Sequence, residues 1–125
     1  MTDAPDASQF PPDLLAAQKL LHELYAEIHV FPVVRRLPWS VEPLDAIKDT
    51  QGWRKVEREA SPGWSDEDKA AYEELWRKAH KQAAFVQCHR YWAGLEATDL
   101  VRARMKLKHD PAAQPAPVAT EPVAA

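Results

Sequence analysis

The residues best suited to catalytic chemistry in this sequence lie around its single cysteine. His89 follows Cys88 directly and His80 precedes it, so a thiol nucleophile activated by a histidine base is the first chemistry to weigh. However, Cys88 stands in an apolar stretch, where a cysteine is usually a small core residue, and adjacent residues of a helix point about 100° apart. The sequence alone leaves enzyme activity undecided. Our interpretation is that the chain is not catalytic on its own.

The patterns that usually hold metals or phosphates are absent from the sequence. A metal site in a helical bundle needs Glu-x-x-His or His-x-x-x-His pairs on one helix face, and neither occurs. His22 and His29 are two helical turns apart and are typical of the polar rim of a helix. Gly52, Gly63 and Gly94 are isolated rather than clustered in a phosphate-binding loop. We therefore predict no metal site and no cofactor.

Length, charge and cysteine content favour one small soluble domain. A chain of 125 residues can build one modest hydrophobic core, and a net charge of −3 does not indicate a polyanion-binding protein. The single cysteine excludes a disulfide within the chain and weakly indicates a reducing compartment. The acidic N-terminus is unlike a secretory signal, and no apolar segment reaches the roughly 20 residues of a membrane span. We expect a cytoplasmic protein that contacts no membrane.

Prolines and apolar spacing predict the first helix. Pro11 and Pro12 suit a helix start, and Asp13 suits the positive end of the helix dipole. Pro32 disfavours a helical conformation at Phe31, so the helix should end about there. The apolar stripe of this helix consists of Leu14, Ala17, Leu21, Leu24, Tyr25, Ile28 and Phe31.

The segment from residue 32 to residue 60 is predicted to contain a connector and two short helices. The connector has three prolines, and we expect it to be extended and to pack Val34, Leu37 and Trp39 onto the helices. Gly52 lies where the helical phase of the apolar residues changes, which is typical of a helix end. The two groups that point in different directions are Leu44 and Ile47 before Gly52, and Trp53, Val56 and Ala60 after it.

Residues 66–93 are predicted to form the longest helix. Ser65 can cap its start, the acids that follow suit the positive end of the dipole, and Gly94 can bend or end it. A last helix should run from Thr98 or Asp99 to Lys108. Strict alternation of apolar and basic residues within 100–108 leaves a strand as the alternative, and we favour the helix. The core stripe of the longest helix consists of Tyr72, Leu75, Trp76, Ala79, Ala83 and Val86.

The predicted fold class is all-α. We expect residues 10–109 to form a single domain, a small helical bundle with one long helix. Residues 1–9 are short and polar, and residues 110–125 combine frequent proline and alanine with no large apolar side chain. Such composition is typical of disordered ends. The chain should therefore have a disordered N-terminus and a disordered Pro/Ala-rich C-terminal tail.

A second apolar stripe at the end of the longest helix carries the functional prediction. The stripe lies on a different side from the core stripe and comprises Phe85, Cys88, Trp92 and Leu95. Either another element of this chain or another molecule must cover it. We predict a non-enzymatic protein–protein interaction module whose partner is another protein or a second copy of the chain. Its apolar anchors would be Phe85, Trp92 and Leu95, with Lys81 and Arg90 as orienting charges.

The basic C-terminal third gives an alternative function. From Trp76 to His109 the bases far outnumber the acids, which favours contact with a phosphate backbone. The bases are distributed around the helix, however, and no element for reading bases is evident. The alternative is a nucleic-acid-binding regulatory protein that uses Arg102, Arg104, Lys106 and Lys108.

Two segments also carry a family resemblance. They are PGWSDEDKAAYEELW at residues 62–76 and HRYWAGLEATDLV at residues 89–101. This region resembles the helical part of nitrile hydratase β subunits and their accessory (activator) proteins, in which such a segment packs on the catalytic α subunit. The chain departs from that family at Cys88 and His89, where tyrosines are usual, and no β-barrel portion follows. The resemblance implies an accessory subunit or a maturation factor of an enzyme. The matching positions are Trp64, Trp76, Tyr91, Trp92, Leu95 and Glu96.

Overall fold

The structure is a computed structural model, and it describes residues 9–49 and 56–115. Helices make up most of these residues, so the predicted all-α class is confirmed. The described elements, in chain order, are α1 (Pro12–Val34), β1 (Ile47–Asp49), β2 (Val56–Arg58), α2 (Asp66–Gln87), the 3-10 helix η1 (Arg90–Gly94), α3 (Ala97–His109) and the 3-10 helix η2 (Pro111–Ala113).

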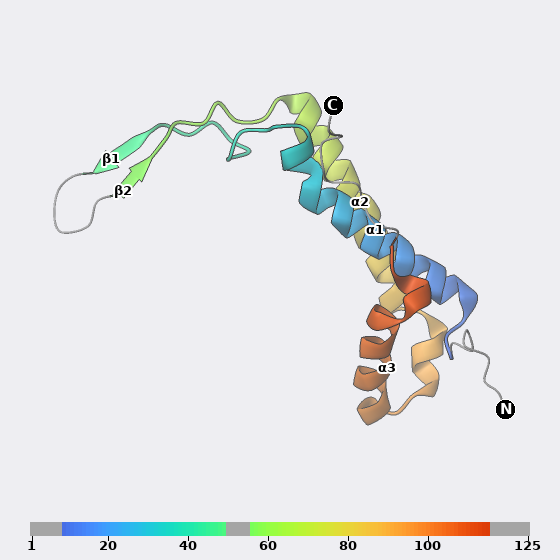
Figure 1. The fold of residues 1–125 in the computed structure, drawn as a ribbon. Coiled ribbons are helices and arrows are strands. Elements are labelled where there is room, and N and C mark those ends of the chain that lie inside the picture. Colours follow the sequence, from blue (N-terminus) through green and yellow to red (C-terminus); the bar gives the residue numbers. More distant parts are fainter. Residues whose placement is uncertain (1–8, 50–55, 116–125) are drawn as a thin grey trace.

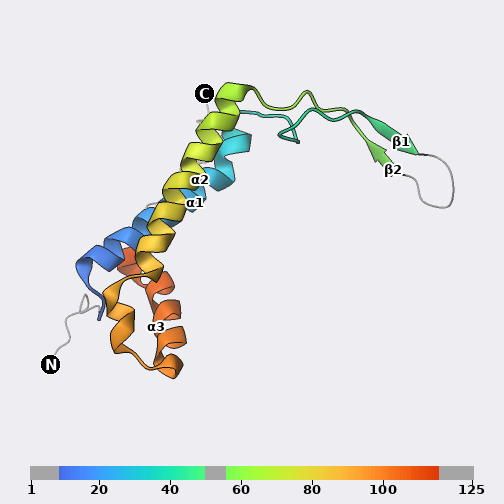
Figure 2. The same ribbon diagram turned by 180° about the vertical axis from the view of Figure 1, so that it is seen from behind.

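The body of the molecule is an antiparallel pair of long helices, α1 and α2, with α3 packed across one end (Figures 1 and 2). This is the end at which α1 begins and α2 finishes. The core has two parts along the pair. The part nearest α3 consists of Phe10, Leu14, Ala17, Val86, Trp92, Ala103 and Leu107. The part further away consists of Leu21, Leu24, Ile28, Phe31, Trp64, Leu75 and Ala79.

Both predicted core stripes are confirmed, with one exchange on α1. Tyr25 is exposed, and Gln18 is buried instead. Gln18 occupies an inward position because its side-chain amide has a partner, the ring of His22, at 3.0 Å. On α2, the predicted stripe faces α1: three of its residues are buried and the other three pack partly buried beside them.

The first helix extends past the predicted end at Phe31. Pro32 lies inside α1, and the helix ends at Val34. A proline in the last turn removes one N–H donor, and the backbone that follows still forms the bonds that close the end of the helix. The N–H groups of Arg35 and Leu37 donate to the carbonyls of Phe31 and Pro32 at 3.1 and 2.9 Å. The cost of Pro32 is therefore confined to one position, and the helix continues.

The second long helix starts as predicted but ends earlier. Ser65 Oγ accepts a hydrogen bond from the backbone N–H of Asp68 at 3.1 Å, which is the expected N-cap. The prediction that this helix continues to residue 93 is wrong, because α2 ends at Gln87. His89 is extended, and its ring Nδ1 accepts from the N–H of Tyr91 at 3.0 Å, which starts η1. This change of direction turns the following residues toward the core.

The last helix is confirmed, and the strand alternative for residues 100–108 is wrong. Ala103 and Leu107, one helical turn apart, are buried against α1 and η1 residues. The helix starts at Ala97, so Thr98 and Asp99 lie inside it rather than at its cap. The alternation of apolar and basic residues is real, but a helix buries only those positions that recur every three or four residues.

The first residues of the predicted disordered tail belong to the folded body. Ala113 in η2 is fully buried, and its carbonyl accepts a hydrogen bond from His22 Nδ1 at 2.8 Å. The side chain of Asp110 accepts from the N–H of Ala112 and caps this turn. The tail boundary at residue 110 is therefore corrected to a position beyond Ala113. Residues 116–125 and 1–8 lie outside the described residues, so that part of the prediction stays open.

The segment predicted as two short helices is a β-hairpin instead. Strands β1 and β2 pair antiparallel, with Ile47 opposite Arg58 and Lys48 opposite Glu57. A glycine between two short runs that each contain a β-branched residue is also typical of a hairpin, and this signal competes with the change of helical phase. Gly52 itself lies outside the described residues. Figure 1 shows the hairpin standing away from the helices.

The connector before the hairpin packs less than predicted. Leu37 is partly buried against the second part of the core, as expected. Val34 and Trp39 are exposed, so their predicted packing onto the helices is wrong. Among the described residues, no helix has the length and apolarity needed to cross a membrane.

Candidate functional site: an apolar arm

Two of the three predicted apolar anchors are covered by the chain itself. Trp92 is only 6% exposed, and its ring packs on Phe10 and Tyr91. Its indole N–H donates to the carbonyl of Val86, so the polar edge is also satisfied. Leu95 is partly buried against the same cluster. Because α2 ends before Trp92, the predicted second stripe does not exist as one helix face, and it cannot act as the docking surface.

The remaining residues of that predicted surface are exposed but do not form one patch with the anchors. Phe85 is exposed in the last turn of α2 and contacts the ring of His89. Lys81 lies one turn earlier on α2, and Arg90 lies on η1, after the chain has changed direction. Both charged residues are exposed, and neither is in an ion pair of the described residues.

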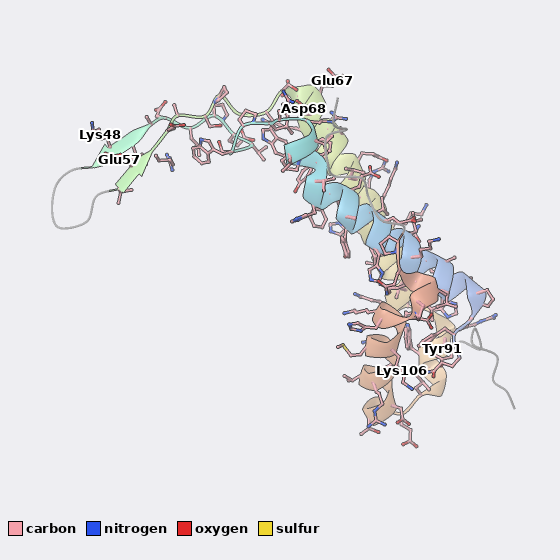
Figure 3. All side chains as sticks on the ribbon, in the orientation of Figure 1. Lys48, Glu57, Glu67, Asp68, Tyr91 and Lys106 are labelled. Atoms are coloured by element: carbon pink, nitrogen blue, oxygen red, sulfur yellow. The ribbon has the colours of Figure 1, made fainter. Side chains whose placement is uncertain are left out.

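The four bases of the nucleic-acid alternative are all exposed on α3, but they divide between two sides of it. Arg104 and Lys108 line a cavity shared with α1 and α2. Arg102 and Lys106 line a different hollow, together with the carboxylate of Asp99. Figure 3 labels Lys106 on α3. A phosphate backbone needs its cations gathered along one track, and α3 does not supply one.

The cysteine–histidine neighbours do not form a nucleophile and base. Cys88 is exposed at the C-cap of α2, so its predicted role as a small core residue is wrong. Both ring nitrogens of His89 are engaged in structural contacts. Nδ1 caps η1, and Nε2 lies 3.0 and 3.1 Å from the two carboxylate oxygens of Asp13. The hydrogen bond from His89 lowers the pKa of the Asp13 carboxyl. This pair ties the start of α1 to η1, which is a structural task.

The described residues also contain no group of three or more histidine, cysteine, aspartate or glutamate side chains that could hold a metal ion. The carboxylates with shifted pKa values are instead surface ion-pair partners. The Arg35 guanidinium, 2.8 Å from Asp68, lowers the pKa of that carboxyl, and the Ser65 hydroxyl adds to the effect. The paired Arg77 likewise lowers the pKa of Glu74. These carboxylates are partly exposed and paired with arginines, so they are not candidates for acid–base catalysis.

The segment that carries the hairpin has several large apolar side chains that are exposed. We call residues 39–61 the arm, of which residues 50–55 are not described. Figures 1 and 2 show its hairpin extending away from the helices, and large apolar side chains along the arm are exposed. They are Trp39, Val41, Leu44, Ile47 and Val56.

The strand register places part of this apolar surface on one face. Side chains alternate between the faces of a strand, and residues that pair across antiparallel strands share a face. Ile47 and Val56 therefore lie on the same face as Arg58, while Lys48 and Glu57 lie on the other. Figure 3 labels Lys48 and Glu57 on the hairpin.

A tryptophan extends the apolar face. The guanidinium of Arg58 lies over the ring of Trp39, 5.4 Å from its centroid, so Trp39 belongs to the Arg58 side of the arm. Trp39 is 54% exposed, Val56 47% and Ile47 39%. We call Trp39, Ile47, Val56 and Arg58 the arm face. Arg58 forms no ion pair within the described residues, although its guanidinium donates to the carbonyl of Asp45 at 3.2 Å.

The arm is attached to the body through a defined set of contacts. Trp64, which is buried in the core, donates its indole N–H to the carbonyl of Pro38 at 2.9 Å and its backbone N–H to the carbonyl of Val41 at 2.8 Å. Leu44 and Ser61 exchange two backbone hydrogen bonds at 2.8 and 2.9 Å. These bonds fix the direction in which the arm leaves the helices, so the arm is not a free linker.

Sequence reasoning missed the arm face as a site. Ile47 and Val56 were predicted to lie on two short helices and Trp39 to pack from the connector onto the helices, while an exposed face was expected on the longest helix. The usable signal was the density of prolines and β-branched residues across 32–47, which indicates an extended segment at the surface.

Comparison with known proteins places the chain in a family. The chain belongs to the domain family of unknown function DUF8825, which matches residues 13–110. The matched range begins in α1 and ends after α3, so it includes the arm and every core residue named above except Phe10. No curated protein and no solved structure matches the chain.

Proposed function

We propose that this DUF8825 protein is a non-catalytic interaction module that docks another protein through the arm face. The observation that carries the proposal is an exposed apolar face on a hairpin that is held away from the body. A two-stranded hairpin without packing partners is marginally stable in water. A partner that covers Trp39, Ile47 and Val56 would remove apolar surface from water and stabilise the hairpin at the same time.

The expected partner is a different protein that presents an apolar surface bordered by a carboxylate. Arg58 stands among the apolar residues of the arm face and has no carboxylate partner within the described residues. In a two-fold dimer the arm face meets a second copy of itself, and Trp39, Ile47 and Val56 offer no carboxylate to Arg58. A carboxylate on another protein can pair with the guanidinium.

The sequence resemblance favours one kind of interaction module, namely an accessory subunit or a maturation factor of an enzyme. The positions that carry the resemblance to nitrile hydratase β subunits and activator proteins are Trp64, Trp76, Tyr91, Trp92, Leu95 and Glu96. Trp64 and Trp92 are buried in this chain, where they support the arm and the core. The proposal therefore assigns docking to the arm and assigns the matching tryptophans to holding the fold.

The test uses three forms of the full chain, the wild type, an arm variant and a control variant, as affinity baits in cells of the organism that encodes the chain. The arm variant carries Ile47→Thr and Val56→Thr, because threonine keeps the β-branched shape while a hydroxyl replaces the ethyl group of isoleucine or one methyl group of valine. The control carries Val101→Thr and Met105→Gln, two exposed apolar positions of α3. A protein recovered with the wild type and with the control is then purified, and its affinity for each form is measured by calorimetry.

We expect one defined complex with the wild type and an affinity at least roughly tenfold lower for the arm variant, since a few central residues dominate most interfaces. The control should bind like the wild type. Equal binding by the arm variant would contradict the proposal. Elution of the chain as a homodimer would also contradict it. Salt-sensitive binding to heparin, with no protein partner recovered, would contradict it as well and would favour the nucleic-acid alternative.

A further inference from the structure

A cavity of about 580 Å³ lies where α1, α2 and α3 meet, on the body rather than on the arm. Its volume falls within the range of roughly 300–1,000 Å³ that is usual for small-molecule sites. Apolar side chains from all three helices contribute to its walls, among them Leu21, Val86 and Leu107. Nothing in the proposed docking function uses this cavity.

One wall of the cavity is held by a chain of hydrogen bonds. His22 lines the cavity, and its Nδ1 lies 2.8 Å from the carbonyl of Ala113. A carbonyl can only accept, so Nδ1 carries the proton, and Nε2 accepts from the side-chain amide of Gln18 at 3.0 Å. The turn η2 is thereby fixed against α1. The wall is preformed, and a ligand would not need to order it.

The opposite wall carries two positive charges. Arg104 and Lys108 are four residues apart on α3 and both line the cavity. Neither is in an ion pair of the described residues, and none of the side chains that line the cavity is a carboxylate. Arg104 is further held over the ring of Trp92, 5.6 Å from its centroid. The cavity therefore combines an apolar interior with an uncompensated positive edge.

We propose that this cavity binds a small organic anion, with its anionic head at Arg104 and Lys108 and its apolar body against the accessible side chains of Tyr25 and Ala83. A guanidinium and an ammonium one helical turn apart can contact the same phosphate or carboxylate group. A bare inorganic anion would leave the exposed ring of Tyr25 in contact with water, so an anion that carries an apolar body should bind more tightly. A phosphate monoester and a carboxylate share the required chemistry.

The experiment is an NMR titration of the full chain with four probes. Phenyl phosphate and phenylacetate each join an anionic head to an apolar ring, and they distinguish the two kinds of head. Inorganic phosphate lacks the apolar body, and benzyl alcohol lacks the charge. We expect saturable shifts of backbone amide signals around Gln18, His22 and Lys108 with at least one of the two amphiphilic anions. Affinity for inorganic phosphate and for benzyl alcohol should be at least roughly tenfold lower.

Matched variants on α3 test the assignment of the head. Lys108→Glu reverses the charge at the cavity without touching the ring of Trp92, and should weaken binding at least roughly tenfold. Lys106→Glu makes the same charge change on the other side of α3 and should leave affinity within about twofold of the wild type. Equal losses in both variants would overturn the proposal, since they would show only general attraction. Shifts scattered away from the cavity, or none with either amphiphilic anion, would overturn it as well.

Discussion

At the residue scale, one glycine decides how the arm leaves the body. Gly63 has a φ of +79°, a conformation that other residues rarely adopt. A Cβ at this position would lie 2.7 Å from the backbone nitrogen of Pro43 and 2.9 Å from the carbonyl oxygen of Val41. Both atoms belong to the base of the arm. The sequence Pro-Gly predicts a turn here, but the close approach of a second segment cannot be read from it.

Gly63→Ala should therefore destabilise the protein by about 1–3 kcal/mol, through the strained φ and the contact with backbone atoms that cannot rotate away. Gly94→Ala is the matched control, because a Cβ there meets nothing within 4 Å. Its effect should stay within about 0.5 kcal/mol of the wild type or be slightly stabilising. Urea unfolding of the three proteins measures the difference. Equal stability of the two variants would show that the base of the arm is not packed as described.

At the element scale, helices were predictable wherever one apolar stripe recurs at the helical period. The stripes of α1 and α2 predicted both helices and the surfaces by which they pack. The end of α2 was not predictable, because it depends on His89 capping η1 and contacting Asp13, which is far away in sequence. The hairpin was missed because its strands are three residues each, too short for an alternating pattern to outweigh helical spacing.

Substitutions on α3 test whether the C-terminal elements are part of the core. Leu107 is 1% exposed and packs in the cluster that contains Leu14 and Trp92. Leu107→Ala should lower the free energy of unfolding by about 2–5 kcal/mol, since it leaves a cavity in that cluster. Met105→Ala on the same helix removes an exposed side chain and should change it by about 0.5 kcal/mol or less.

Denaturant unfolding, analysed with a common m-value, measures the change in the free energy of unfolding for Leu107→Ala and for Met105→Ala. If Leu107→Ala behaved like Met105→Ala, α3 would have to be an appendage of the helix pair, and the cavity between the three helices would lose one of its walls.

At the scale of the whole molecule, the structure separates a helical body from an arm with an uncovered apolar face (Figure 1). The helical fold class was predicted correctly from the sequence, but exposed apolar anchors were expected at the end of the longest helix, where Trp92 and Leu95 are covered by the chain itself. Trp92 and Leu95 were chosen because they extend the spacing of α2, and the chain uses them to close its own core. The exposure of Trp39, Ile47 and Val56 depends on where the arm points, which local sequence does not determine.

The most direct test of the arm as a docking surface is site-specific photo-crosslinking in cells. The photoreactive residue p-benzoylphenylalanine replaces Val56 on the arm face in one form of the full chain. In a matched form it replaces Val101, which is exposed on α3. After irradiation, the product from position 56 should be a single covalent adduct with one other protein, and position 101 should give none. An adduct with a second copy of the chain, equal adducts from both positions, or no adduct from position 56 would contradict the account.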